Sequence, residues 1–230
     1  EIRIRDWSSD VCSSDLIEAI WRYLLDGRRA KIPAGLERQA IELKPVDRPL
    51  IYRNFLEGLS PRGIAVGFPE RVHYAWDAEH MTVRLIWHGA FIDAAKHWVD
   101  RGPGNQVPLG DHVMALPAGP PMAKLASLDQ SWPGGNPRET GFRFRGYSLD
   151  VAGIPTMRYE WSGVEVEETL TPIPNEPDSG LRRTLVIKSK EQLNDVWLRL
   201  ALGKIEQVKG GYVWNGVRLV VEKGLAVVRR

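Results

Sequence analysis

From residue 50 onward, the sequence consists largely of short runs of β-branched and aromatic residues separated by turn residues. The clearest run, FRFRGYSL at 142–149, alternates apolar and polar side chains. Such alternation predicts a strand with one buried face and one solvent face. Closely spaced strands with turn residues between them favour an antiparallel β-sandwich or barrel. We therefore expect a mainly β protein, an antiparallel β-sandwich, preceded by one short α-helix.

The predicted strands follow one another with little helix between them. They cover residues 50–56, 63–68, 72–76, 82–87, 142–149, 156–161, 164–169, 181–188 and 196–202. In YVWNGVRLVV, Asn215-Gly216 separates two β-like runs and predicts a two-residue type I′ hairpin. A last strand is predicted at 225–229, where the sequence stops. We therefore expect the β-rich domain, 50–230, to be incomplete at its C-terminus, and a truncated mutarotase-like supersandwich is one form of the expected fold.

The charge balance argues against several functions. The chain has 230 residues, and its 31 basic and 29 acidic residues give a net charge of +2. The basic residues are scattered, which speaks against a nucleic-acid partner. No apolar run approaches the ~20 residues that span a bilayer, and no signal peptide is visible. The single cysteine, Cys12, excludes an internal disulfide and any CxxC metal or redox motif.

The first sixteen residues form a poor structural element. Residues 6–15 are mostly Ser and Asp, which favour turns and caps, so disorder is predicted there. Cys12 lies near Asp10 and Asp15, an acidic setting that works against a reactive thiolate. DWSSDVCSSDL, at 6–16, also resembles the in-frame translation of a common sequencing adapter. We therefore expect residues 1–16 to be artefactual or disordered.

The segment IEAIWRYLLDG, at 17–27, predicts one short amphipathic helix. Its apolar residues form a single stripe, and Gly27 then offers a left-handed stop. Residues 28–49 follow as a linker that ends near Pro45 and Pro49. A second irregular region, the Pro- and Gly-rich residues 100–137, is predicted to be a long loop that is either functional or packed over a surface.

The segment LIWHGAFIDAAKHWVDRGPG, at 85–104, has the highest density of chemically versatile side chains. The candidate ligand-binding residues in it are Trp87, His88, Asp93, His97, Trp98 and Arg101. If FIDAAKHW is helical, Asp93 and His97 form an i, i+4 pair, and two histidines with a carboxylate can bind a divalent metal. The favoured interpretation is a hydrophobic plug whose polar side chains bond nearby backbone, so no metal site is predicted.

The sequence predicts no catalytic residue. In VEVEET, Glu165 and Glu167 share one strand face and Glu168 lies opposite, and alternating Glu residues are typical of a solvent face. The carboxylate pairs of glycosidases usually come from different strands or loops. GxSxG, P-loop and HExxH motifs are absent. Tryptophans such as Trp76 and Trp132 could form a sugar-stacking surface, although core packing is the default.

Part of the chain resembles a known family. IEAIWRYLLDGRRAKIPAGL is similar to the last helix of a class I cytochrome c domain and its exit. The phrases RPLIYRNFLEGLSPRGIAVGFPERVHYAWDAEHMTVRLIWHGAFIDAAKHWVDRGPG, PLGDHVMALP, FRFRGYSLD and IPTMRYEWSGVEVEE resemble the module that follows the haem domain in large secreted c-type cytochromes of environmental bacteria. The resemblance spans most of residues 17–230.

This resemblance implies a parent protein that carries haem c, transfers electrons and works in the periplasm or outside the cell. Residues 17–27 would then be the last helix of a truncated cytochrome c domain, and the upstream haem domain would be a partner within the same chain. The sequence departs from the family pattern because CxxCH is absent and every methionine lies beyond the helix that the axial methionine normally precedes. We therefore expect no haem in this chain itself.

Two functions are consistent with these observations. The first is a binding or scaffold module, a β-sandwich behind a c-type cytochrome domain that performs the electron transfer. The second is a carbohydrate-binding or carbohydrate-active β-sandwich that holds a saccharide through the Asp93 and His97 segment and the long loop. A cleft lined by tryptophan that gathers His88, Asp93 and His97 would favour the second function. Burial of these groups against backbone would favour the first.

Overall fold

The computed structural model describes residues 21, 41–95, 105–127 and 129–221, and these are mainly β. Its contacts divide the chain into two compact units, 1–39 and 40–230, and the strands belong to the second. They are β1 (Glu42–Leu43), β2 (Leu50–Arg53), β3 (Gly63–Gly67), β4 (Val72–Asp77), β5 (Thr82–His88), β6 (Ile92–Asp93), β7 (Asp111–Ala115), β8 (Met122–Lys124), β9 (Arg143–Leu149), β10 (Pro155–Trp161), β11 (Val164–Ile173), β12 (Gly180–Ser189), β13 (Val196–Leu198), β14 (Ile205–Val208), β15 (Gly211–Trp214) and β16 (Val217–Leu219). The described residues contain no helical element, and hence no helix long and apolar enough to cross a membrane.

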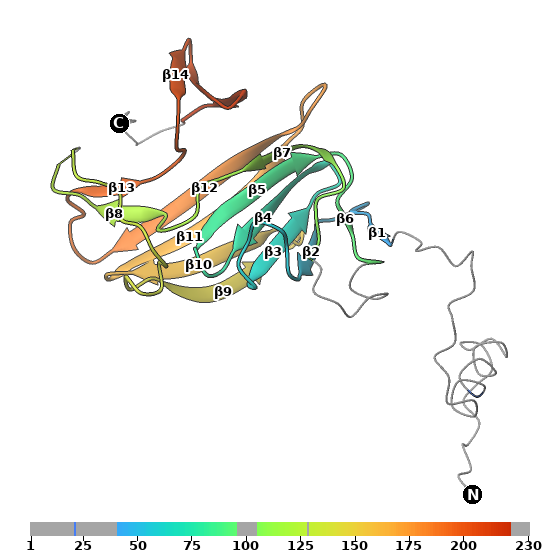
Figure 1. Ribbon diagram of the computed structural model, residues 1–230, viewed down its shortest axis with the longest axis horizontal. Coiled ribbons are helices and arrows are strands. Elements are labelled where there is room, and N and C mark those ends of the chain that lie inside the picture. The colour runs from blue at the N-terminus through green and yellow to red at the C-terminus, as the bar shows by residue number, and fades with distance from the viewer. Residues whose placement is uncertain (1–20, 22–40, 96–104, 128, 222–230) are drawn as a thin grey trace, which may run out of the picture. The chain divides into compact units, whose positions relative to one another are not determined.

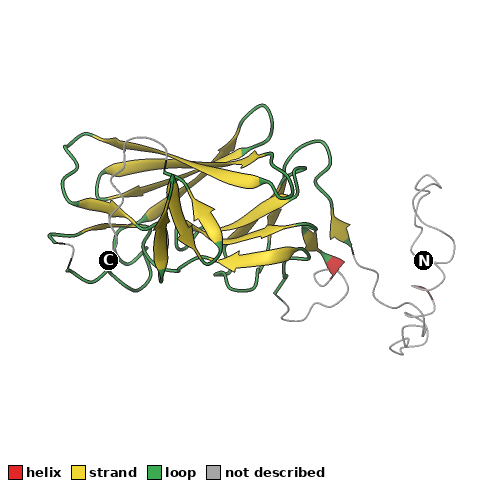
Figure 2. Cartoon of the chain, turned by 90° about the horizontal axis from the view of Figure 1, so that it is seen from above, coloured by secondary structure: helices red, strands yellow, loops and turns green. Residues whose placement is uncertain are grey.

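These strands pair into antiparallel sheets (Figure 1). The larger two have the strand orders β2-β3-β4-β5-β7 and β12-β11-β10-β9. Smaller sheets pair β13 with β8, β14 with β15 and β16, and β1 with β6. Most neighbours in a sheet are also neighbours in the sequence, which is the connectivity that short turns allow. Figure 2 shows the same strands after a quarter turn.

The main hydrophobic core joins the two larger sheets. Tyr74 and Trp76 of β4 and Met157 and Tyr159 of β10 are at most 1% exposed and belong to one cluster. The ring of Trp76 lies 5.0 Å from Phe144 of β9 and 6.2 Å from Tyr159, measured between centroids. Because side chains alternate along a strand, each of these strands contributes one face to this core.

The opposite face of the five-stranded sheet is covered as well. A second cluster there consists of Leu56, Ala65, Ala75, Leu85, Trp87, Phe91 and Ile92. This explains why β3 and β4 are buried along their whole length instead of in alternation. Gly67 permits the close cover, because a Cβ at this position would lie 2.7 Å from Pro45 Cγ and 2.8 Å from the Phe91 ring.

The predicted strand pattern is confirmed over most of the β-rich domain. Each run predicted as a strand between residues 50 and 202 contains one. The predicted hairpin is also present: β15 and β16 are joined by Asn215, with φ of 48°, and Gly216, with φ of 80°. Both positive values are required at the centre of a type I′ turn. The predicted strand at 225–229 lies outside the described residues.

The predictions for the regions expected to be irregular need correction. The loop predicted at 100–137 contains β7, which pairs with β5, and β8, which pairs with β13. The linker predicted at 28–49 contains β1, which pairs with β6. Ile92 and Asp93 form β6, whereas residues 96–98, which the i, i+4 pairing of Asp93 with His97 would need, lie outside the described residues. These strands are two to five residues long, so each depends on a distant partner more than on its own sequence.

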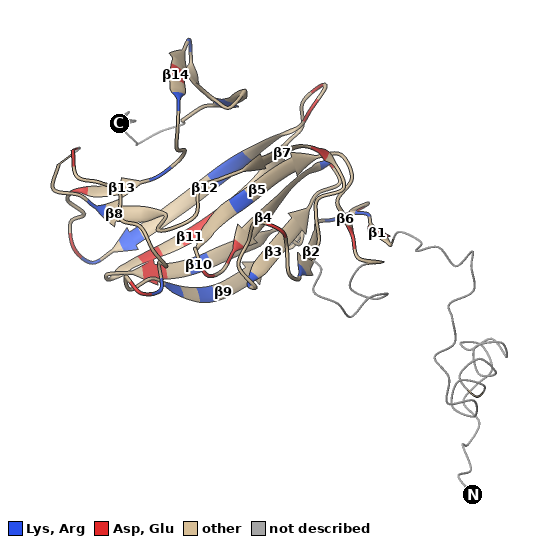
Figure 3. Ribbon diagram, viewed as in Figure 1, with Lys and Arg blue, Asp and Glu red and all other residues tan. Residues whose placement is uncertain are grey.

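The surface of the described strands has two further features. Lys and Arg residues are spread over several strands and are mixed with acidic residues (Figure 3). β12 is an outer strand of its sheet and, among the described residues, pairs only with β11. Val186 and Ile187 of this strand remain 45% and 37% exposed.

Of the predicted N-terminal features, residues 1–16 lie outside the described residues. So does the predicted helix at 17–27, apart from Trp21. The Trp21 side chain is 61% exposed. The helix itself therefore stays a prediction.

Candidate functional site

The six residues predicted to bind a ligand do not form one described cluster. Trp87 is fully buried in the second core, where its ring stacks on Phe91 at an interplanar angle of 3°. Its indole N–H donates to the carbonyls of Ala90 and Phe91, each at 3.2 Å. Trp87 is thus a core residue in this structure.

His88 follows Trp87 in β5 and points to the opposite face of the sheet. Its Nε2 donates to the carbonyl of Ser179 at 2.8 Å, which ties β5 to the start of β12. The nearest ring partner given by the structure is His112, with centroids 6.2 Å apart. Trp87 and His88 therefore cannot line one cleft.

Asp93 accepts hydrogen bonds from nearby backbone amides. Its Oδ1 accepts hydrogen bonds from the amides of Ile41 at 2.8 Å and Ala95 at 2.9 Å. His97, Trp98 and Arg101 lie outside the described residues, so their part in a site stays a prediction. Within the described ranges, no three His, Cys, Asp or Glu residues are arranged to hold a metal ion.

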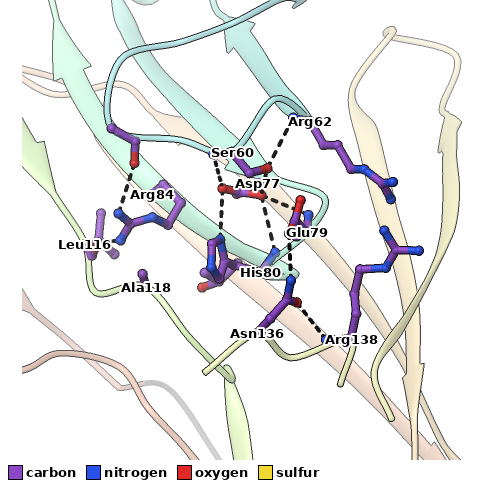
Figure 4. Close-up of polar contacts among 12 residues, drawn as sticks. Ser60, Arg62, Asp77, Glu79, His80, Arg84, Leu116, Ala118, Asn136 and Arg138 are labelled. Atoms are coloured by element: carbon purple, nitrogen blue, oxygen red, sulfur yellow. Dashed lines mark hydrogen bonds and ion pairs between the residues drawn. The ribbon is translucent and has the colours of Figure 1, made fainter. Parts of the chain in front are cut away.

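A polar cluster that was not predicted surrounds the turn between β4 and β5. We call it the turn cluster; it comprises Ser60, Asp77, Glu79, His80 and Asn136. Figure 4 shows Asp77 at its centre. The Asp77 carboxylate is fully buried and accepts five hydrogen bonds. Two come from Ser60 (amide and hydroxyl), two from His80 (amide and Nδ1) and one from the Glu79 amide.

The bonds around Asp77 outweigh the cost of its burial. Burial raises the pKa of this carboxyl, but the hydrogen bonds from Ser60, His80 and Glu79 stabilise the anion, and the net effect is a lowered pKa. Asp77 is therefore ionised at neutral pH. It fixes the turn by satisfying backbone amides that the hairpin itself leaves free.

His80 is the member of the turn cluster that can still act on a ligand. Its Nδ1 donates to Asp77 at 3.0 Å, so the neutral ring directs its acceptor nitrogen, Nε2, away from Asp77. The side chain is 23% exposed. A carboxylate behind an imidazole orients either a base or a metal ligand. Ser60 donates to Asp77 and not to His80, so the three do not form a Ser-His-Asp triad.

The turn cluster is extended by the second half of the long loop. Asn136 donates from Nδ2 to Glu79 at 2.6 Å and accepts from the amide of Arg138 at 3.0 Å (Figure 4). Described segments far apart in the sequence, 58–60, 77–84, 116–118 and 136–138, thus meet beside the turn between β4 and β5. Parts of the loop predicted at 100–137 therefore pack against this turn.

Two arginines lie next to the turn cluster, and we call them the arginine pair, Arg84 and Arg199. Arg84 occupies a β-bulge, because Trp76 pairs with Val83 while Ala75 pairs with Leu85. A bulge of this kind redirects the side chain of the extra residue. The Arg84 guanidinium donates to the carbonyls of Leu116 and of Gly58, the latter at 3.0 Å.

Arg199 approaches the same loop from the other side. Its Nη2 donates to the carbonyl of Ala118, and its guanidinium lies 5.4 Å from the centre of the Trp132 ring. Trp132 in turn donates to the carbonyl of Pro120 at 3.0 Å. Burial lowers the pKa of both arginines, and the charge of Arg84 adds to this effect at Arg199. The two cations are therefore close enough to repel each other.

A third polar group lies inside the main core. Glu168 of β11 is fully buried, and its Oε1 accepts from Arg183 Nε of β12 at 2.7 Å. The hydroxyls of Tyr74 and Tyr159 are buried beside this core ion pair and have no hydrogen-bond partner in the described structure. Burial, followed by the Glu168 charge, raises the pKa of both tyrosines. The sequence placed Glu168 opposite Glu165 and Glu167 but did not reveal its burial.

No family model, curated protein or solved structure matches this chain. The structure itself defines a mainly β protein of several antiparallel sheets. The polar groups that could carry a function are the turn cluster, the arginine pair and the core ion pair, which is Glu168 with Arg183.

Proposed function

We propose that this chain is the β-sandwich module of a c-type cytochrome. Its role there is to bind a ligand or to act as a scaffold. The observation that carries the proposal is that the buried charged and imidazole groups bond to the fold itself. Asp77 holds a turn, Glu168 pairs with Arg183, and His73 bonds through both ring nitrogens to Phe68 and Gly89. Groups used in this way stabilise the module and leave chemistry to another domain. A mutarotase-like supersandwich is the finer form of the proposed fold.

The residues of this chain do not fit a haem. The only cysteine is Cys12, and CxxCH is absent. Met81, Met122 and Met157 are at most 1% exposed and serve as core residues, so their thioethers are not presented to a ligand. Met114 of β7 is partly exposed, but without CxxCH the chain has no attachment site for a haem that it could ligate. The proposal therefore assigns haem c to an upstream domain of the parent protein and derives no step through haem here. By the same resemblance, the parent is proposed to be periplasmic or extracellular.

The test of this proposal is recovery of the complete gene. We expect a CxxCH motif upstream of residue 17, c-type haem absorbance in the purified parent protein, and none in the 230-residue chain. A complete gene without CxxCH would overturn the cytochrome assignment. Haem bound by the 230-residue chain would overturn the division of roles between the two domains.

One observation favours a saccharide-binding role for the same module. Trp132 is partly exposed beside Arg199, at the end of the sheets where the long loop packs. An indole beside fixed hydrogen-bond donors is a common arrangement for holding a sugar ring. Calorimetry of the chain with oligosaccharides tests this role, and measurable binding of one of them is the expected result. Absence of binding to every class of saccharide would contradict it.

A further inference from the structure

We propose that the arginine pair binds the oxyanion of an acidic saccharide, beside Trp132. This inference rests on the saccharide-binding role proposed above and names the chemical class that the site takes. The oxyanion is a carboxylate or a sulfate, because a guanidinium donates in parallel to the oxygens of either group.

Geometry brings the two cations together over one short segment. Arg84 donates to the carbonyl of Leu116, and Arg199 donates to the carbonyl of Ala118, two residues further on. Arg84 reaches this position from the bulge in β5, and Arg199 from the residue after β13.

The charges of this pair are only partly compensated within the described structure, because Asp77 acts on Arg84 alone. Neither arginine forms an ion pair with a carboxylate there, although Asp77 acts on Arg84 electrostatically. The Asp77 oxygens already accept five hydrogen bonds. Carbonyl oxygens satisfy some of the donors, but Arg84 Nε is buried without a partner. Arg84 and Arg199 are both partly buried and Arg84 acts unfavourably on Arg199, which costs free energy that a bound anion would offset.

The surroundings of the pair suit a saccharide better than a free ion. Both guanidinium groups and Trp132 are partly exposed, so a ligand can reach them from solvent. The indole offers an apolar surface to the C–H face of a sugar ring, while the arginines take its acidic group. His80, next to Arg84 on β5's own hairpin, directs Nε2 outward as an acceptor for a sugar hydroxyl.

The test is calorimetric titration of the full chain at constant ionic strength. The probes are an oligogalacturonate, a sulfated oligosaccharide and a neutral oligosaccharide of similar length. We expect an acidic probe to bind more tightly than the neutral one. The acidic probe with the higher affinity shows whether the site takes a carboxylate or a sulfate. Arg199→Gln and Arg84→Gln should each weaken that binding about tenfold or more, as loss of a charge-assisted hydrogen bond implies.

The matched control is Arg158→Gln, which removes the same charge from an exposed position on β10. It should leave the affinity unchanged, and Trp132→Ala should weaken acidic and neutral probes alike. Unchanged affinity in Arg199→Gln, with a lowered melting temperature, would overturn the proposal by showing that the arginine only holds the loop. Equal affinity for neutral and acidic probes would contradict the proposed oxyanion site but would be consistent with the proposed saccharide-binding role. No binding at all would overturn both.

Discussion

Asp77 shows how one carboxylate can organise a turn. Among the described residues it forms no ion pair with a lysine or arginine, and hydrogen bonds from Ser60, Glu79 and His80 stabilise it. Asp77→Asn keeps the size of the side chain but replaces one acceptor oxygen with a donor that faces other donors. We expect a loss of about 3 kcal/mol in the free energy of unfolding, measured by urea denaturation. Ser60→Ala removes only one of the donors and should cost about 1 kcal/mol. Equal losses would contradict this account.

Because of His73, the free energy of unfolding should fall as pH falls. Burial lowers its pKa below the ordinary value of 6.5, and the charges of His88 and Arg71 act in the same direction. Above pH 6.5 the ring is neutral in both states, and its full contribution to stability is present. As pH falls below that value, the unfolded chain takes up a proton that the folded ring resists, so stability is lost.

The measurement is the free energy of unfolding between about pH 7.5 and about pH 5.5. His73→Gln should be less stable than the natural chain at the upper end and should show a smaller decline towards acid. A decline of the same steepness in both proteins would assign the effect to groups other than His73.

At the scale of elements, the core ion pair joins β11 to the outer strand β12. Arg183→Met leaves the Glu168 carboxylate buried and unpaired, which should cost about 3–5 kcal/mol. The double variant Glu168→Leu with Arg183→Met replaces both charges and should recover most of that loss. A double-mutant cycle by urea unfolding measures the coupling. A double variant less stable than Arg183→Met would contradict the expectation.

The hairpin of β15 and β16 depends on its two central residues. Gly216 has φ of 80° with open space around it, so backbone conformation and not crowding is what a side chain would disturb. Gly216→Ala should destabilise the hairpin by about 1 kcal/mol. Hydrogen exchange of the β15 amides is the measurement, and Gly58→Ala, at another open left-handed glycine, should leave those amides unaffected.

The elements that could be predicted are those whose own pattern is decisive. β9, β10 and β12 carry enough alternation to be located to within a residue or two, and Asn215-Gly216 is a signal in itself. β7 and β8 could not be located because their sequences, DHVMA and MAK, are short and depend on pairing with β5 and β13. Glu168 was missed because a strand pattern shows which residues share a face but not that a charged one faces a core.

On the scale of the whole molecule, the two larger sheets depend on a shared aromatic core. Trp76 contacts rings on both β9 and β10 and is fully buried. Trp76→Ala should therefore cost about 3–5 kcal/mol, measured by thermal or urea unfolding. Val151→Ala, at a fully exposed position, should have no measurable effect. A small loss at Trp76 would mean that the sheets hold together without this contact.

The candidate site illustrates what a sequence pattern leaves out. The predicted residues near 85–104 are close together in sequence, yet Trp87 and His88 diverge because neighbouring strand residues face opposite ways. The arginine pair comes from β5 and from the chain after β13, and neither residue lies in a motif. Only the closing of the sheets brings them together, and the bulge at Arg84 has no sequence signature that could have marked it.

The open side of β12 has a practical consequence for work with the protein. A strand of ten residues with exposed Val186 and Ile187 can template the addition of another strand, from the same chain or a foreign one. Lys188, the next residue of β12, forms an ion pair with Glu167 of β11 at 3.1 Å, so its charge is partly compensated within the sheet. Concentrated samples are therefore expected to form β-rich aggregates, and their suppression by Val186→Lys, which places a charge on the edge strand, would trace the growth to this edge.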